Sequence, residues 1–216
     1  MAEKEHVRSH AGSSGVLAML ALLLLLLGGA FALSASSPAT EARAAEARAV
    51  RAPDSILGRP IYGEARVKRY ARSIGSTRYI LRTIPIYYRL APRRGLAPDV
   101  LIAQAILETG RGHYGGDSRP WNMAGIKKGG RVGDAPRDFE RPRTPRAGVR
   151  MHINHMAAYT GRRPIGKPHD RFYDARAAQK ARGYWVRRIS QLGGGVWATD
   201  PSYGRKIRRI LDEMGQ

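Results

Sequence analysis

The 216-residue chain is long enough for one domain with a hydrophobic core plus terminal appendages. Its formal net charge is +21, which favours a polyanionic partner such as nucleic acid, anionic lipid or an anionic cell wall. Cysteine is absent, which excludes disulfides and thiolate metal sites. Residues 1–50 hold four basic and four acidic side chains, so the whole positive excess belongs to residues 51–216.

The N-terminus is predicted to direct export of the chain. A polar segment, residues 1–14, precedes an apolar run from Val16 to Leu33 with a poly-Leu centre. Residues 15–33 are predicted to be either a cleaved signal peptide, because small residues follow the leucines, or an uncleaved membrane anchor, because the run is just long enough to span a bilayer. Either alternative exports the rest of the chain, although Glu3 and Glu5 weaken the signal for orientation. We therefore expect an extracellular or cell-wall-associated protein, free or anchored to the cell membrane by residues 16–33.

Residues 34–55 are rich in Ala, Ser, Arg and Glu and are predicted to be a linker, which leaves residues 56–216 as the domain. Its first helical segments are marked by apolar residues around Val67 and around Ile80, and Pro85 should break or bend the second segment. From Pro98 to Leu107 the apolar residues fall on every side of a helical projection, which predicts a helix buried inside the domain.

Gly110 is a natural stop for this central helix, so Glu108 should lie in its last turn. There the negative end of the helix dipole and shielding by Tyr114 and Trp121 would both favour the protonated carboxyl. A carboxylic acid that remains protonated near neutral pH is what a general acid requires.

The motif around Glu108 resembles a known family. It reads Gln104-x-x-x-Glu108-Thr-Gly, then Tyr114-Gly-Gly, then Trp121-Asn122-x-x-Gly-Ile-Lys. This is similar to the glucosaminidase family of peptidoglycan hydrolases, glycoside hydrolase family 73. The resemblance implies a mainly α (α+β), lysozyme-like helical domain with a small β-hairpin lobe. It also implies hydrolysis of the β-1,4 bond between N-acetylglucosamine and N-acetylmuramic acid, without a cofactor.

By the same resemblance Glu108 would be the general acid, and Gln104, Tyr114, Trp121 and Asn122 would bind the glycan. The chain departs from the family at Arg111, where tryptophan is frequent, and at Trp121-Asn122, where two asparagines are frequent. These departures bear on the preference for sugars more than on the reaction.

Gly129 to Arg141 is predicted to form a small hairpin or a long loop. An extended strand there would place Asp138 and Glu140 on one face. Glycoside hydrolysis usually requires a second carboxylate, and Asp138 or Glu140 is the candidate. The alternatives are that both are simply solvated among arginines, and that the substrate's own N-acetyl group acts as the nucleophile.

Thr144-Pro145 supplies an N-cap and a first helical position for a helix through Tyr159. His152 and His155 share a side of this helix. No HExxH pattern or further ligand cluster accompanies them, so we expect structural or groove-edge histidines and no metal site.

The C-terminal part should contain an irregular connection, Gly161 to Lys180, with a short helix near Ala175, and a helix from Tyr184 to Leu192. Asp200 should cap a last helix that starts at Pro201. The run from Trp197 to Tyr203 resembles "WATDPxY" in the same family, which implies that Tyr203 lies in the active-site groove near the scissile sugar. Packing in the core is its alternative role.

Two other functions fit the sequence. A lytic transglycosylase or muramidase of lysozyme-like fold also works with one key glutamate, and a non-catalytic basic module would only bind the cell wall. The expected partners are peptidoglycan glycan strands and anionic cell-wall polymers, together with the membrane if the N-terminal segment is not cleaved. Nucleic acid is not expected for an exported protein.

Overall fold

The structure, a computed structural model, describes residue 37, residues 53–115 and residues 120–216. The predicted hydrophobic segment, residues 15–33, lies outside these ranges, as does most of the predicted linker. Within the described ranges no helix has the length and apolar character needed to cross a membrane. The described part is mainly helical, which confirms the predicted class. Its α-helices are α3 (Glu64–Ser73), α4 (Arg78–Leu90), α5 (Pro98–Glu108), α6 (Pro145–Tyr159), α7 (Arg171–Ala181) and α8 (Tyr203–Gly215), and its short 3-10 helices are η1 (Ala91–Arg94), η2 (Pro136–Asp138) and η3 (Ile189–Leu192).

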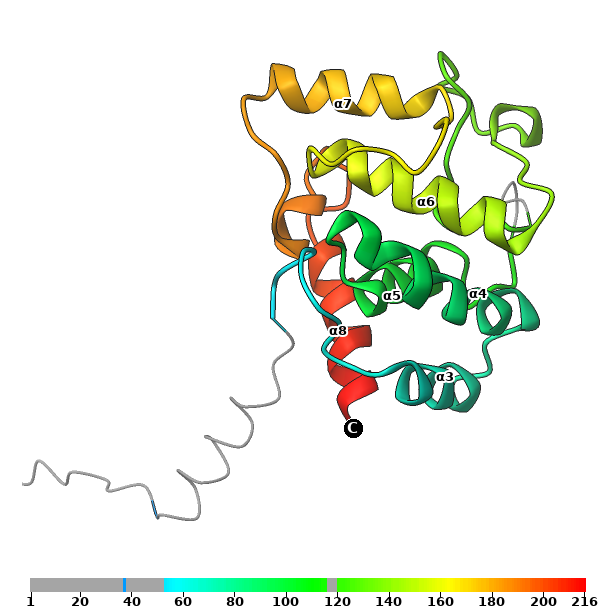
Figure 1. Cartoon of the computed structure of the whole chain (residues 1–216), viewed down its shortest axis with the longest axis vertical. Coiled ribbons are helices and arrows are strands. Elements are labelled where there is room, and N and C mark those ends of the chain that lie inside the picture. Colours follow the sequence, from blue (N-terminus) through cyan, green and yellow to red (C-terminus); the bar gives the residue numbers. More distant parts are fainter. Residues whose placement is uncertain (1–36, 38–52, 116–119) are drawn as a thin grey trace, which may run out of the picture. The chain divides into compact units, whose positions relative to one another are not determined.

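Helix α5 lies at the centre of the domain (Figure 1). Every residue from Pro98 to Ile106 is buried, which confirms the prediction of a helix that is apolar on all sides. It packs against α4 and α8, while α4 also contacts α3 and α6, and α7 covers the far side of α6. This arrangement brings the end of α5 close to elements from the last third of the chain.

The end of α5 follows the prediction as well. Gly110 has a left-handed φ of 53°, which glycine adopts without strain. The Thr109 hydroxyl donates to the Ala105 carbonyl at 2.7 Å, and it accepts from the Gly112 amide at 2.9 Å. These bonds close the helix and fix Glu108 in its last turn.

Helix α4 continues through Pro85, so of the two outcomes predicted there, a break or a bend, the break is wrong. Proline lacks the amide hydrogen that would bond to the carbonyl of Leu81. Ile84 and Tyr87 on either side of it are nevertheless fully buried, as is Leu90 at the end of the helix. Burial of this apolar face outweighs the loss of one hydrogen bond.

The predicted helix from Tyr184 to Leu192 is also wrong except for its last turn, η3. The backbone of this segment bonds to distant parts of the chain instead. The amide of Val186 donates to Tyr159 at 3.0 Å, and the carbonyl of Arg187 accepts from Ile56 at 3.0 Å. The apolar periodicity could not reveal this competition, because the partners lie elsewhere in the sequence.

The predicted hairpin at Gly129 to Arg141 is not confirmed. In the described residues its pairing is limited to one antiparallel bridge between Lys127 and Phe139. Around this bridge the Lys128 amide donates to the Asp138 carbonyl at 2.8 Å, and the Glu140 amide donates to the Ile126 carbonyl at 2.9 Å. The 3-10 helix η2 occupies residues where an extended strand was expected.

Helix α6 has the predicted bounds, with Pro145 first and Tyr159 last, and its N-cap Thr144 accepts from the Ala147 amide at 3.1 Å. Helix α7 is longer than the short helix expected near Ala175. Helix α8 begins at Tyr203, two residues later than predicted, because Asp200 bonds to the amide of Ser202 at 2.7 Å and forms a turn before the helix.

Candidate active site

Glu108 is half-buried, and two donors converge on one of its carboxylate oxygens. Trp197 Nε1 donates to Glu108 Oε1 at 2.9 Å, and the Tyr203 hydroxyl donates to the same oxygen. Burial raises the pKa of Glu108 above its usual value, while the hydrogen bonds from Tyr203 and Trp197 oppose this shift. The side chain therefore has the character of a general acid with one fixed oxygen.

The other oxygen, Oε2, faces a loop. A Cβ atom built on Gly125 would lie 3.7 Å from Glu108 Oε2, and Gly125 has a left-handed φ of 57°. Asn122 holds this loop: its side-chain oxygen accepts from the Ile126 amide at 2.9 Å, and its nitrogen donates to the carbonyls of Ile126 at 2.8 Å and Glu140 at 3.2 Å. The loop thus keeps a residue without a side chain next to Oε2.

A cavity of about 370 Å³ lies next to this place, because two neighbours of Glu108, Gly125 and Trp197, line it, although Glu108 itself is not among its lining residues. The Trp197 ring packs at 5.0 Å from the ring of His155 and at 5.0 Å from that of Tyr159. The full lining comprises Ala124, Gly125, Ile126, Lys127, His155, Tyr159, Arg171, Trp197 and Thr199. The described lining of this cavity therefore offers a ligand an aromatic wall and two cationic side chains, and it contains no carboxylate.

Behind Glu108 the hydrogen bonds continue into the core. Gln104 Nε2 donates to the Tyr203 hydroxyl at 2.9 Å, His152 Nε2 lies 3.0 Å from Gln104 Oε1, and the Tyr87 hydroxyl lies 2.7 Å from His152 Nδ1. Burial lowers the pKa of His152 to about 3, so its ring is neutral at physiological pH. We call these four residues, Tyr203, Gln104, His152 and Tyr87, the relay.

Gln104 and Asn122 are therefore placed inside the protein. Gln104 is 0% exposed and Asn122 is 1% exposed, and the oxygen and the nitrogen of both side-chain amides bond to other protein groups. The sequence predicted a sugar contact for each. In this structure the two side chains support Glu108 and its neighbouring loop from within.

Tyr114 and Trp121 form an aromatic cluster with Tyr79. Their ring centroids lie 5.4 Å and 4.8 Å from that of Tyr79, and the Tyr114 hydroxyl contacts Met123 Sδ at 3.2 Å. Both residues have positive φ, as does Arg111, and such values are uncommon for residues other than glycine. The Arg82 guanidinium also lies 5.7 Å from the Trp121 ring centroid, and no described ring contact or hydrogen bond joins Tyr114 or Trp121 to Glu108.

The two candidate second carboxylates lie apart from the cavity beside Glu108. Asp138 is 6% exposed, and its Oδ2 accepts from the Ala135 amide at 3.2 Å within its own loop. Glu140 lines a separate cavity of about 340 Å³ that also includes Arg150, Lys167 and His169. Burial raises the pKa of Glu140. More of the Glu140 side chain than of the Asp138 side chain is exposed to solvent.

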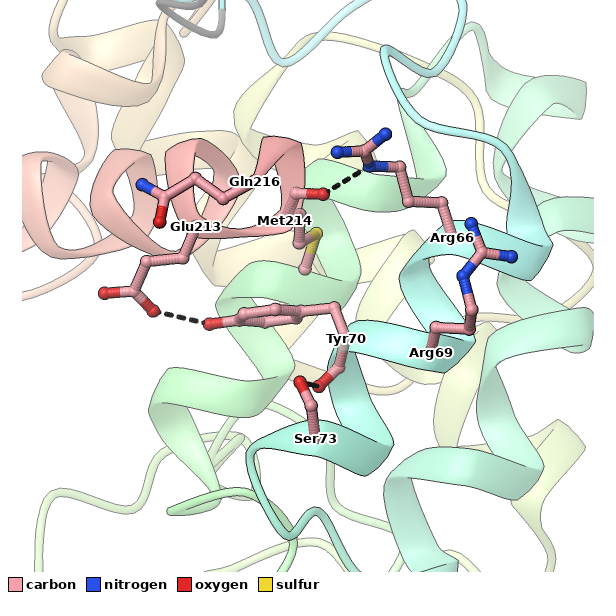
Figure 2. Close-up of a pocket in the computed structure, with 7 residues that line it drawn as sticks. All are labelled: Arg66, Arg69, Tyr70, Ser73, Glu213, Met214 and Gln216. Carbon is pink, nitrogen blue, oxygen red and sulfur yellow. Dashed lines mark hydrogen bonds between the residues drawn. The ribbon is translucent and has the colours of Figure 1, made fainter.

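A third cavity, of about 290 Å³, lies between α3 and the end of α8 (Figure 2). Arg66 donates to the carbonyls of Met214, at 2.7 Å, and of Gly215, and the Tyr70 hydroxyl donates to Glu213 at 2.7 Å. These polar groups bond to one another, and none was a predicted site residue. The contacts hold α3 against α8 and leave the cavity at Glu108 as the candidate site.

Sequence reasoning singled out Glu108 and Tyr203, which the structure brings into contact, but it missed most of what surrounds them. Trp197 was recognised only as part of a motif, and Tyr87 was not singled out. Lys127 was noted only as the last residue of the motif that begins at Trp121, and Arg171 lies in a segment that was expected to be mostly irregular, so no local signal marked it. Within the described residues no group of three or more histidines, cysteines and acidic residues is arranged to hold a metal ion.

The chain was compared with known proteins in three ways. A family model named Glucosaminidase and described as mannosyl-glycoprotein endo-beta-N-acetylglucosaminidase matches residues 84–216, which is more than half of the chain. This range contains Glu108, both of its donors and the whole relay. Searches of curated proteins and of solved structures each gave no match.

Proposed function

Because this chain belongs to the glucosaminidase family, we propose that it is the type of peptidoglycan hydrolase that cleaves the β-1,4 bond between N-acetylglucosamine and N-acetylmuramic acid. The family supports a glycoside hydrolase acting on a peptidoglycan-type glycan. The observation that carries the finer proposal is Glu108, a half-buried carboxyl of raised pKa beside an aromatic cavity.

In this mechanism Glu108 protonates the glycosidic oxygen. The proton leaves Oε2, because Oε1 already accepts from Trp197 and Tyr203. The bond between C1 and the protonated oxygen then breaks, and positive charge develops on the sugar ring. The ionised Glu108 that remains can later take a proton from the water that attacks C1.

The lining of the cavity favours the substrate's N-acetyl group as the partner of Glu108. None of the described lining residues is acidic, Asp138 is held within its own loop, and Glu140 lines another cavity. The carbonyl oxygen of the N-acetyl group would bond to C1 as the glycosidic bond breaks, and water would then open that ring. Asp138→Asn and Glu140→Gln test the alternative: loss of activity in either variant would assign the second role to that carboxylate.

The walls of the cavity suit an anionic sugar polymer. Trp197 and Tyr159 offer aromatic faces for sugar rings, and Arg171 offers positive charge for carboxylates of the peptides attached to N-acetylmuramic acid, whereas Lys127 is already paired with Asp134 at 2.8 Å. Such a substrate lies outside the cytoplasm, in accord with the export predicted for residues 15–33. The net charge of +21 would also hold the protein on anionic wall polymers, and this adsorption should weaken as salt is added.

The test is a digest of purified peptidoglycan by the full-length chain, with Glu108→Gln and the control variant Glu64→Gln beside it. The products are reduced, and their end groups are identified by mass spectrometry. New reduced N-acetylglucosamine ends from the native chain and Glu64→Gln, and none from Glu108→Gln, are the expected result. Reduced or anhydro N-acetylmuramic acid ends would instead indicate a muramidase or a lytic transglycosylase. Wall binding without new ends would indicate a binding module.

A further inference from the structure

The relay joins α4, α5, α6 and α8 through side chains that water cannot reach. Tyr87, Gln104 and His152 are each 0% exposed, and Tyr203 is 6% exposed. Successive members lie 2.7, 3.0 and 2.9 Å apart, and the last bond reaches Glu108. Burial of polar groups lowers the stability of the fold unless each donor has an acceptor. This requirement determines where the hydrogens of the relay lie.

The direction of the relay follows from its two ends. An ionised Glu108 can only accept, so the Tyr203 hydroxyl donates to it and itself accepts from the Gln104 nitrogen. The Gln104 oxygen must then accept from His152 Nε2, which leaves Nδ1 as an acceptor for the Tyr87 hydroxyl. All four hydrogen bonds therefore point from Tyr87 towards Glu108.

If all four hydrogen bonds pointed the other way, every donor in the relay except the Tyr87 hydroxyl would still have an acceptor. Glu108 would donate to Tyr203, and His152 would donate from Nδ1 to the Tyr87 oxygen. The hydrogen of the Tyr87 hydroxyl would then need a further acceptor, and His152 is its one hydrogen-bond partner among the described residues. Reversal thus leaves a fully buried hydroxyl hydrogen unpaired, which is unfavourable.

We propose that Tyr87 is a positioning residue for the acid, because it holds the relay in the direction that ends with a donor on Glu108 Oε1. With Oε1 also bound by Trp197, the acidic proton is confined to Oε2, the oxygen beside Gly125 at the cavity. The catalytic meaning of this arrangement rests on the function proposed above. The direction itself is a property of the folded protein and can be measured without any substrate.

Other titratable groups around the relay keep a constant charge near neutral pH. His155 faces His152 from the same helix, and burial lowers its pKa well below the usual value. Tyr114 lies near Tyr87, and Tyr159 lies near Tyr203; burial raises the pKa of both. Glu108 is therefore the group whose titration should report a change in the relay.

The first test needs no variant. Nitrogen NMR of the histidines in the full-length chain distinguishes the two neutral tautomers of His152. The expected form carries its proton on Nε2, with Nδ1 shifted by the hydrogen bond from Tyr87. A proton on Nδ1 would mean that the relay runs the other way and would overturn the proposal.

The second test compares Tyr87→Phe with Tyr88→Phe. Tyr88 is the next residue on α4, and its hydroxyl donates to the backbone of Tyr62, outside the relay. Without the Tyr87 hydroxyl the hydrogen bonds of the relay can reverse their direction. The Tyr203 hydroxyl then donates to Glu108 for only part of the time. We expect a higher pKa for Glu108 by carboxyl-carbon NMR in Tyr87→Phe, with a severalfold lower kcat and an unchanged KM. Tyr88→Phe should match the native chain in all three.

A double variant separates the relay from general packing. Tyr203→Phe removes the last donor, so adding Tyr87→Phe to it should not raise the pKa of Glu108 further. Additive shifts, or a Tyr87→Phe titration identical to that of Tyr88→Phe, would overturn the proposal. Thermal unfolding checks that each variant is folded. If the native chain proves inactive on peptidoglycan, the proposed function fails, while the NMR titrations still decide the direction of the relay.

Discussion

The hydroxyl of Tyr203 donates directly to the carboxylate of Glu108, although the two residues are 95 positions apart in the sequence. The contact joins the first turn of α8 to the last turn of α5. The sequence left two roles open for Tyr203, one in the groove and one in the core. In the structure it is nearly buried, and it is the link between the candidate acid and the polar interior.

Replacing Trp197 by phenylalanine should weaken the acid while keeping most of the packing. The indole donor lowers the pKa of Glu108, so its removal should raise that pKa. A general acid fails when it ionises, so the alkaline fall in activity should move to higher pH. We also expect kcat to drop about tenfold, since a hydrogen bond to a charged group is lost. The pH profile of glycan hydrolysis measures both effects, and Trp185→Phe, outside the site, should change neither.

Asn122→Ala should destabilise the loop that carries Gly125. The variant leaves the amide of Ile126 and the carbonyl of Glu140 without their partner, while the Ile126 carbonyl keeps its bond from the Glu140 amide. We expect the free energy of unfolding to fall by about 1–3 kcal/mol and kcat to fall with it. Urea denaturation of the substrate-free protein measures the first quantity. A higher KM with unchanged stability would instead indicate that Asn122 contacts the sugar.

Gly148→Ala should be destabilising although alanine is the better helix former. A Cβ atom at Gly148 would lie 1.9 Å from the carbonyl oxygen of Trp121, so α6 and that loop must move apart. We expect a loss of about 1–3 kcal/mol in the free energy of unfolding, typical of overpacking. Urea denaturation measures it. Gly63→Ala is the matched control, since nothing lies within 4 Å of its added methyl group; equal stability of the two variants would contradict the close approach.

The buried histidines should make the protein sensitive to mild acid. Burial lowers the pKa of His152 to about 3 and that of His169 to about 4, and it also lowers that of His155, against 6.5 in the unfolded chain. Below pH 6.5 the unfolded chain therefore binds more protons than the folded one. Stability should be complete above pH 6.5 and should decline as the pH falls towards 4, by up to about 1.4 kcal/mol per pH unit for each imidazole.

Urea unfolding at several pH values between 5 and 7.5 measures this slope. Asp99 and Glu108 act in the opposite sense, because burial raises their pKa values and their contribution is lost as the pH rises. His169→Gln should reduce the change in the free energy of unfolding per pH unit by the contribution of one imidazole. A slope that His169→Gln leaves unchanged would show that His169 is not held neutral in the folded protein.

The sequence predicted the elements that depend on local pattern. The continuous apolar face from Pro98 and the stop at Gly110 defined α5 and placed Glu108 correctly, and Thr144 with Pro145 defined the start of α6. These signals lie within the elements themselves, so no knowledge of tertiary contacts was needed.

What the sequence could not predict depends on contacts between distant segments. The relay joins side chains that lie between 48 and 99 positions apart, and no periodicity records such pairs. The segment after Tyr184 has helical spacing, but pairing of its backbone with Ile56 and Tyr159 prevails. The hairpin was expected from glycine content and a resemblance, and neither specifies how far two strands stay paired.

The distance between Glu108 and its donors also matters for how the protein is made. A ribosome adds Glu108 89 residues before Trp197 and 95 residues before Tyr203. During that interval the carboxyl has neither of the bonds that fix its proton. The nascent chain therefore acquires the hydrogen bonds of the proposed acid only after α8 has begun to fold onto α5, when synthesis of the domain is almost finished.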